Sequence, residues 1–174
     1  MLLLAALGGA AAVSARRSAT ERAAHARDAA EAERQDRWGD AVRLWTRLEA
    51  LGDASAGAKA RLASQAGAGA QDRRRSTDLA AEAAARARDH AAERVRAADL
   101  DREILAAREA LRPGDPVEER RAMWGLEKAR DEAARKAVGI EVQVLGLLAS
   151  ALRHDPSNRE AAVQLAEFQW ARLL

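Results

Sequence analysis

Proline interrupts this chain of 174 residues at only two places, which leaves room for helices much longer than usual. Pro113 and Pro116 enclose one short glycine-containing segment, and Pro156 follows Asp155. Between these breaks the sequence consists mostly of Ala, Arg, Glu and Leu, which favour helices. The 47 alanines and five aromatic residues leave too few β-branched and aromatic side chains for a β-sandwich or barrel. We therefore expect an all-α fold of long antiparallel helices, arranged as a helical hairpin or bundle.

Charge and cysteine content exclude several kinds of site. The 29 basic and 27 acidic residues leave a net charge of +2, and the two signs are interleaved as on solvated helix faces. We therefore do not expect nucleic acid as a partner. Because the chain has no cysteine, it has neither a disulfide framework nor a thiolate metal site.

The chain begins with an uninterrupted apolar run, Met1 to Val13. At ~1.5 Å per residue a helix of this length spans roughly 20 Å, less than the ~30 Å hydrocarbon core of a membrane. A signal peptide with a small-residue cleavage site at Ala15 fits the run, although no basic residue precedes it. The end of a transmembrane helix and a buried globular helix are the other interpretations. We assign residues 1–17 as an apolar membrane or signal-like segment and expect residues 1–15 to contact a membrane.

The next two segments differ in their content of large side chains. Residues 18–51 are expected to form a stalk helix, opened by a Ser18–Glu21 capping box and ending in a helix with large apolar residues on one face. Its first part carries no large apolar side chain and should be exposed. Residues 52–75 are rich in glycine and small polar residues, so we expect a flexible linker, with room for a short helix at 56–65.

Residues 76–174 are expected to form a helical bundle. Two long helices, from about Thr77 to Leu111 and from Val117 to about Arg153, are separated by the break around Pro113. A last, shorter helix follows Pro156. The expected N-terminal caps of the three helices are Ser76 or Thr77, Asp115 followed by Pro116, and Ser157 with Glu160.

The helix that starts at Val117 carries two apolar stripes. The first has near-heptad spacing: Met123, Leu126, Arg130, Ala133, Ala137, Ile140, Val144, Leu147 and Ala151. The second joins it farther along: Val138, Val142, Leu145, Ala149 and Leu152. A helix that is apolar on two faces must be covered on both sides. Gly139 and Gly146 would let a neighbouring helix approach closely.

Residues 151–158 (ALRHDPSN) are similar to the end of a tetratricopeptide repeat (TPR), whose second helix closes in A-L-x-x-D-P-x-N. Leu148 and Val144 fall where that repeat places packing residues, and Leu165 matches its next helix. Residues 38–48 carry the spacing of a repeat's second helix: Trp38, Ala41, Trp45 and Leu48. No period of about 34 residues runs through the chain. The resemblance therefore implies a TPR-like C-terminal helix pair rather than a regular array.

The order of these segments resembles that in large bacterial membrane-spanning kinases of the eukaryotic-like Ser/Thr type. In that family a kinase domain precedes the membrane span and a helical region follows it. The matching motifs are residues 116–120 (PVEER), residues 123–127 (MWGLE) and residues 151–173. The resemblance implies that this chain is the non-catalytic, extracytoplasmic sensor or scaffold portion of such a kinase.

No set of residues in the sequence points to catalysis. Kinase chemistry needs a glycine-rich phosphate loop, a strand lysine and metal-binding aspartates, and none of these motifs is present. The three histidines, His25, His90 and His154, lie far apart and do not have metal-ligand spacing. We expect no catalytic residue, no metal and no cofactor, and the sequence identifies no small-molecule substrate.

The four tryptophans allow two interpretations. Each lies at helical spacing from Leu or Val, which favours core anchors of helix packing: Trp38, Trp45, Trp124 and Trp170. Alternatively, Trp124 and Trp170 line a groove on a TPR-like surface and bind a partner peptide or helix. These two are the candidate partner-binding residues.

The sequence thus favours a non-enzymatic interaction, sensor or scaffold module of a membrane-associated bacterial signalling protein. We expect it to be membrane-anchored or periplasmic, with a protein partner or self-association. Two alternatives stay open. One is a secreted or periplasmic structural coiled-coil protein cleaved after Ala15, and the other is an Arg-rich nucleic-acid-binding helical protein.

Overall fold

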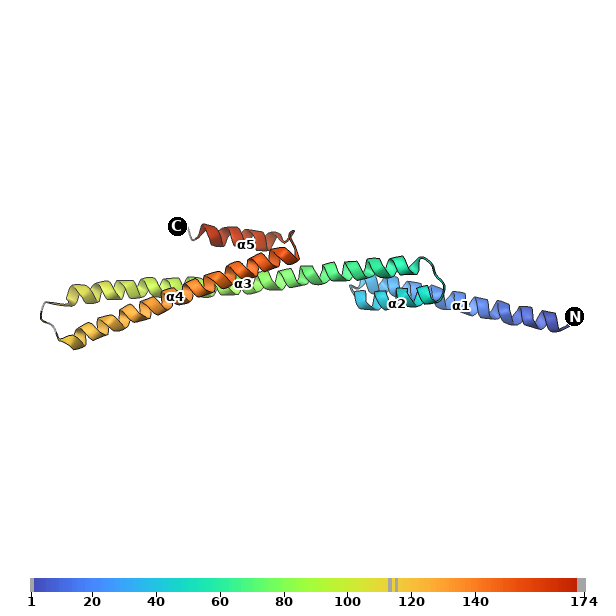
Figure 1. Cartoon of the computed structure of the whole chain (residues 1–174), viewed down its shortest axis with the longest axis horizontal. Helices are drawn as coiled ribbons and strands as arrows, with labels where there is room; N and C mark the ends of the chain where they lie inside the picture. The colour runs from blue at the N-terminus through green and yellow to red at the C-terminus, as the bar shows by residue number, and fades with distance from the viewer. Residues whose placement is uncertain (1, 113, 115, 172–174) are drawn as a thin grey trace. The chain divides into compact units, whose positions relative to one another are not determined.

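The computed structural model describes the backbone of residues 2–112, 114 and 116–171, and side chains from residue 18 onward in these ranges, except at position 119. This part of the chain contains five helices and no strand, which confirms the expected all-α fold (Figure 1). The chain divides into two compact units, Met1–Gln71 (unit 1) and Asp72–Leu174 (unit 2). Helix α3 (Ala56–Ala110) contributes its first part to unit 1 and its remainder to unit 2.

Unit 1 packs α1 (Leu2–Arg34), α2 (Trp38–Ala50) and the start of α3 around a core made mainly of alanine. The buried residues come from all three helices: Ala29, Ala32, Ala41, Trp45, Leu48, Ala56, Ala60 and Ala63. Because alanine buries little surface, Trp45 and Leu48 supply most of the large apolar contact. Trp45 also donates a hydrogen bond from Nε1 to Glu33 Oε1 (2.7 Å), which links α2 to α1.

A turn at residues 35–37 separates α1 from α2 and corrects the expected single stalk helix over 18–51. Asp36 adopts a left-handed backbone conformation with φ of 56°, which reverses the chain without glycine. The two helices then pack on each other and bury Ala29 and Ala32, so this part of the expected stalk is not exposed. Ser18, the expected N-cap, lies inside α1.

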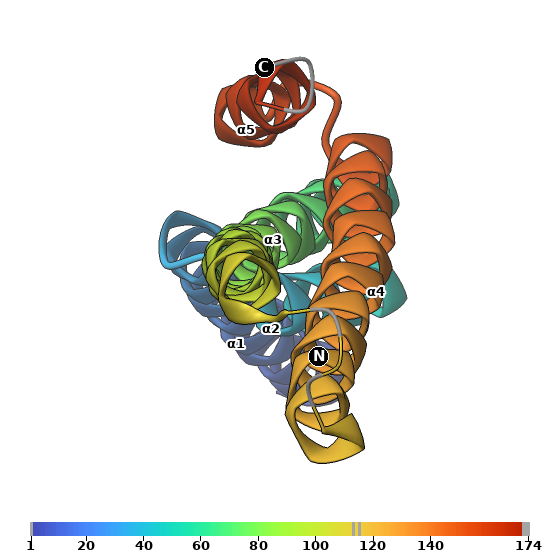
Figure 2. The ribbon, with the colours of Figure 1, turned by 90° about the vertical axis from the view of Figure 1, so that its left-hand side faces the viewer.

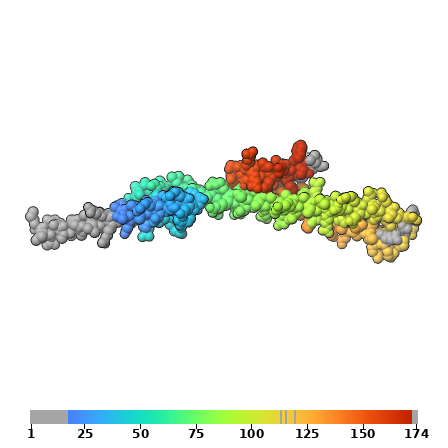
Figure 3. Space-filling view, turned by 180° about the vertical axis from the view of Figure 1, so that it is seen from behind, coloured from blue at the N-terminus to red at the C-terminus, as the bar shows by residue number. Residues whose placement is uncertain are grey.

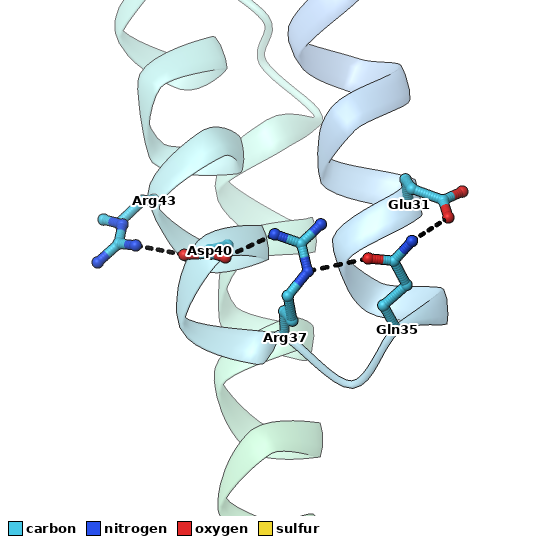
Figure 4. A network of polar contacts seen from close by, with 5 residues as sticks. All are labelled: Glu31, Gln35, Arg37, Asp40 and Arg43. Atoms are coloured by element: carbon cyan, nitrogen blue, oxygen red, sulfur yellow. Dashed lines mark hydrogen bonds and ion pairs between the residues drawn. The ribbon is translucent and has the colours of Figure 1, made fainter.

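Polar side chains form a chain of contacts around this turn (Figure 4). Arg37 donates from Nη1 to Asp40 Oδ2 (2.9 Å) and from Nε to Gln35 Oε1 (3.0 Å). Gln35 in turn donates to Glu31, and Arg43 pairs with the other oxygen of Asp40. The contacts join residues close in sequence and largely exposed, so they orient the turn but add little stability.

The structure has a helix where the sequence predicts a flexible linker over 52–75. A short turn with Gly52 at a positive φ of 88° follows α2, and α3 begins at Ala56. The glycine-rich residues beyond it lie within α3 because α2 packs closely there: a Cβ on Gly67 would lie 2.7 Å from Trp38 Cβ. A glycine inside a helix costs about 1 kcal/mol relative to alanine, and this close packing offsets the cost.

Unit 2 consists of the rest of α3, α4 (Val117–His154) and α5 (Arg159–Trp170). Helices α3 and α4 pack as the expected long hairpin, and α5 lies against them (Figure 2). Ion pairs cross the hairpin from Arg108 to Glu127 (2.6 Å) and from Arg130 to Asp101 (3.2 Å). The buried core residues are Ala80, Ala83, Ile140, Val144, Leu148, Ala151 and Ala161.

The core of unit 2 confirms the first apolar stripe of α4 over its second half. From Ala133 onward the expected residues are buried, with Leu148 rather than Leu147 fully enclosed. At the start of α4 the N-cap is Pro116, and the expected cap Asp115 lies outside the described residues. Ser76 does not cap a helix, because α3 begins 20 residues earlier, at Ala56.

The second stripe of α4 is covered only in part, contrary to expectation: Leu152 packs against the core of unit 2 and Leu145 is half-buried. Val138 and Val142 are 60% and 66% exposed. A Cβ built on Gly139 or Gly146 would meet no described atom within 4 Å, so no neighbouring helix approaches these glycines.

The expectation of an apolar membrane or signal-like segment over residues 1–17 rests on side chains that lie outside the described ones. Within the part of the chain that the structure describes, no helix is both long and apolar enough to cross a membrane.

Candidate interaction surface

The turn between α4 and α5 is held by a buried polar link to α3. Ser76 Oγ donates a hydrogen bond to the carbonyl oxygen of Ala151 (2.8 Å) and accepts one from Asn158 Nδ2 (2.8 Å). Asn158 Oδ1 accepts from the backbone N–H of Ala161 (3.0 Å), so Asn158 is the N-cap of α5. This corrects the expected Ser157–Glu160 capping box. Because Ser76 is fully buried, its hydroxyl depends on these two protein partners for its hydrogen bonds. The link therefore holds α5 on the hairpin.

A second contact set holds α5 farther along. The ring centroid of His90 on α3 lies 5.2 Å from that of Phe168 on α5, and His90 Nε2 lies 3.9 Å from Glu141 Oε2 on α4. Arg94 Nη1 donates to the carbonyl oxygen of Ala171, just after α5 (3.4 Å). Helix α5 is therefore attached to the hairpin at both ends, and it forms a ridge on its surface (Figure 3).

Asp155 stabilises the same turn through Ser157. Its Oδ1 accepts hydrogen bonds from the hydroxyl (2.6 Å) and the backbone N–H (2.9 Å) of Ser157. These bonds, the hydroxyl's first, hold the pKa of Asp155 below its usual value of 3.8. Asp53 and Ser55 make the same arrangement in the turn before α3, which likewise lowers the pKa of Asp53.

We expect Asp155→Asn to remove a pH-dependent part of the stability of unit 2. Because the folded form binds the proton less tightly than the unfolded form, this part is complete above about pH 4 and is lost as the pH falls through the lowered pKa. Urea unfolding at about pH 5 and about pH 3 measures how much free energy of unfolding is lost between the two pH values. This loss should be smaller for Asp155→Asn than for the wild type. Asp53→Asn is the matched control, since its turn lies in unit 1. Equal losses in unit 2 for wild type and Asp155→Asn would contradict the assignment.

The structure separates the four tryptophans into two pairs. Trp45 is buried and Trp38 packs against the core of unit 1, as the core-anchor interpretation predicts. Trp124 and Trp170 are 52% and 65% exposed, so for them that interpretation is wrong. The structure does not bring these two together. The end of α5 lies near Arg94, which contacts Ala171 and lines a hollow together with Ala134 of α4. Trp124 is ten residues from Ala134, or ~15 Å farther along α4.

Neither exposed tryptophan lines the hollow where α5 meets the hairpin. That hollow has a volume of about 340 Å³ and is bordered by side chains of α3, α4 and α5: Ala83, Ala84, Ala87, Val144, Leu148, Gln164, Glu167 and Phe168. Trp170 lies instead on the outward side of α5 with Val163, which is 45% exposed. Residues 163 and 170 are seven apart and share one helix face. The outward side of α5 is therefore an apolar surface open to solvent.

The ionisable groups do not gather into a reactive centre. Among the described side chains, no three or more His, Asp or Glu residues are grouped so that they could hold a metal ion. Two of the histidines have structural contacts, His90 at the three-helix junction and His154 with Asp72 (3.1 Å).

The chain matches no protein-family model, no curated protein sequence and no solved structure.

Sequence reasoning missed the residues that seat α5. Ser76 is surrounded by charged residues, Asp78 among them, and therefore resembles a helix cap. Its burial between the helices could not be recognised from the local sequence pattern. His90 is flanked by Asp89 and alanine and carries no signal of the Phe168 contact. Asn158, in contrast, is the final residue of the D-P-x-N motif, and that motif could have identified it as the cap.

Proposed function

We propose that the chain is a non-enzymatic helical interaction or scaffold module of a membrane-associated bacterial signalling protein. The observation that carries the proposal is the set of large apolar side chains that unit 2 leaves exposed on α4 and α5: Trp124, Val138, Val142, Val163 and Trp170. These side chains form two separate groups, one along α4 and one on α5, and in each group neighbours share a helix face. Apolar residues grouped in this way mark protein contacts more often than single scattered ones. Helix faces of this kind bind other helices through residues spaced three, four and seven apart.

The resemblance of residues 151–158 to the end of a tetratricopeptide repeat supports the same function. Asn158, the last residue of the resembled D-P-x-N motif, caps α5. In a TPR-like pair the surface away from the core is available to a partner, and Trp170 lies there. We place the chain after the membrane span of a Ser/Thr kinase on the basis of its motifs and segment order.

Cross-linking in cells tests the interaction. A photoreactive amino acid at exposed position 166, between Val163 and Trp170 on the outward side of α5, should give an adduct with one defined protein. Trp170→Glu should abolish the adduct, because a charge replaces the central apolar contact. The exposed neighbour Gln169 provides the matched control, Gln169→Glu, which should keep it. If position 166 gives no more adduct than exposed position 85 on α3, the outward side of α5 binds no partner.

The membrane part of the proposal is tested separately. The full chain should sediment with membranes and be released by detergent, whereas a variant without residues 2–15 should remain in the supernatant. A full chain found entirely in the supernatant would contradict membrane association.

A structural coiled-coil role is the second candidate, favoured by the seven-residue spacing along the buried stripe of α4 (Ala133, Ala137, Ile140, Val144 and Ala151). In this case the chain would be exported and cleaved after Ala15. N-terminal sequencing distinguishes the candidates, since a mature chain that starts at Arg16 supports export and one that retains residues 1–15 contradicts it.

A further inference from the structure

Helix α4 has an apolar face that is largely exposed from Val138 to Ala149, while Leu152 at its end packs against the core of unit 2. We call it the open face and define it as Val138, Val142, Leu145, Ala149 and Leu152, together with Gly139 and Gly146. The five apolar residues follow one another at intervals of four, three, four and three, which is the spacing of a coiled-coil seam. Leu145 and Leu152 are half-buried at its edge, while Val138 and Val142 are the most exposed.

We propose that the open face pairs with the open face of a second copy of the chain, with the two α4 helices antiparallel. The inference rests on the proposed function and names the partner of one of its surfaces. It follows from the self-complementarity of the face, since in a twofold interface each contact is made twice.

The shape of the face favours this pairing. In an antiparallel coiled coil the two kinds of seam position face each other, so Val142 lies opposite Leu145 of the second copy and Val138 opposite Ala149. Along one flank Gly139 then lies beside Gly146 of the second copy. Because neither glycine has a side chain or a neighbour within 4 Å, the two backbones can come close there. Large residues thus face smaller ones, and the glycines remove the steric limit on approach.

The charges at the two ends of the face select the antiparallel direction. Residues 131–135 at one end carry Asp131, Glu132 and Arg135, and Arg153 stands at the other end; all four are exposed. In the antiparallel register given above, Arg153 lies beside Glu132 of the second copy; of the other charges near that end, Arg130 pairs with Asp131 and Lys136 pairs with Glu93 on α3. Parallel pairing in register would place Asp131, seven residues before Val138 on the same seam, opposite its own equivalent, which is unfavourable.

The mass in solution is the first test. Purified full-length chain in a density-matched detergent should sediment as a species of about twice 18.7 kDa. Val142→Glu should sediment as the monomer, because a carboxylate would be buried in the seam. Val95 is the matched control, since it is a valine of unit 2 with 60% exposure on α3, and Val95→Glu should stay dimeric. Circular dichroism verifies that both variants are helical.

Disulfide formation tests the direction and register. The natural chain has no cysteine, so single substitutions are the only thiols present. When tagged Val138→Cys and untagged Ala149→Cys chains are mixed and oxidised, the mixed disulfide should dominate over the two homodisulfides. Parallel pairing in register would give the homodisulfides instead.

Charge exchange gives a third, independent readout. Arg153→Glu should raise the dimer dissociation constant by about 2- to 20-fold, as expected for two exposed charge pairs. Adding Glu132→Arg to that variant should restore the wild-type value. A parallel dimer would not show this rescue.

A monomeric wild type, a dimer that persists in Val142→Glu, or a homodisulfide pattern would each overturn the inference. The outcome is separate from that of the proposed function, because the cross-links at position 166 depend on α5 and are measured in cells. A monomeric chain that keeps those cross-links contradicts only the pairing of α4. A dimer without them contradicts only the partner at α5.

Discussion

Replacing Leu148 with alanine should lower the free energy of unfolding of unit 2 by about 2–5 kcal/mol. Leu148 is 1% exposed and lies among Val144, Ala151 and Ala161 where α4 meets α5. Most of its fully buried neighbours are alanines, but Leu147, Leu165 and Phe168 pack against the same cluster and can move partly into the space that the substitution leaves. The cost should therefore lie near the middle of this range, and α5 should detach before the hairpin unfolds.

Urea unfolding followed by circular dichroism measures the change in unit 2. Hydrogen exchange in residues 159–171 shows whether α5 opens first. Leu105→Ala is the matched control, because Leu105 is a leucine of the same unit with 59% exposure, and its truncation should change the stability by no more than about 0.5 kcal/mol. Similar losses for the two variants would mean that Leu148 is not enclosed by α5.

Trp45→Ala should destabilise unit 1 by about 3–5 kcal/mol, the range found for buried tryptophan. Trp45 is 5% exposed and joins all three helices of its unit. Its Nε1 donates to Glu33 on α1, and the ammonium of Lys59 on α3 lies 4.5 Å from its ring centroid. Truncation removes the buried ring, the hydrogen bond and the cation–π contact together, and leaves a core composed largely of alanine.

Thermal unfolding and hydrogen exchange of residues 18–71 measure this effect. Trp170→Ala is the control, because the same substitution at 65% exposure removes little buried surface and should leave unit 1 unchanged. Trp45→Phe separates the contributions, since it keeps most of the buried area and loses the bond to Glu33, at a cost of about 1 kcal/mol. A stable Trp45→Ala variant would show that alanine packing alone holds unit 1 together.

The elements that could be predicted are those with local signals. The break around Pro113 and the turn at residues 154–158 contain proline, which cannot continue a helix whatever surrounds it. The buried stripe of α4 was recognisable because its large residues recur at helical spacing from Ile140 onward. The exposed side of α5 was predicted only as one of two interpretations of Trp170.

Two boundaries in unit 1 could not be predicted from local pattern. The turn at residues 35–37 contains neither glycine nor proline, and its reversal depends on the backbone of Asp36. The glycine-rich stretch after Gly52 resembles a linker, yet it is helical and Gly67 packs closely against Trp38. In the first case no glycine or proline marks the turn, and in the second the contact joins residues that are distant in sequence.

The sequence by itself therefore determined that the chain is all-α, that two helices form a long hairpin, and where that hairpin turns. Prolines and the helix-forming composition act residue by residue, so these outcomes need no knowledge of neighbours in space. Only the tertiary structure decided which apolar faces are covered, that Ser76 and Asn158 seat α5, and that Val138 and Val142 stay open to solvent. Burial is a property of two surfaces in contact, and a single helix's pattern specifies one of them.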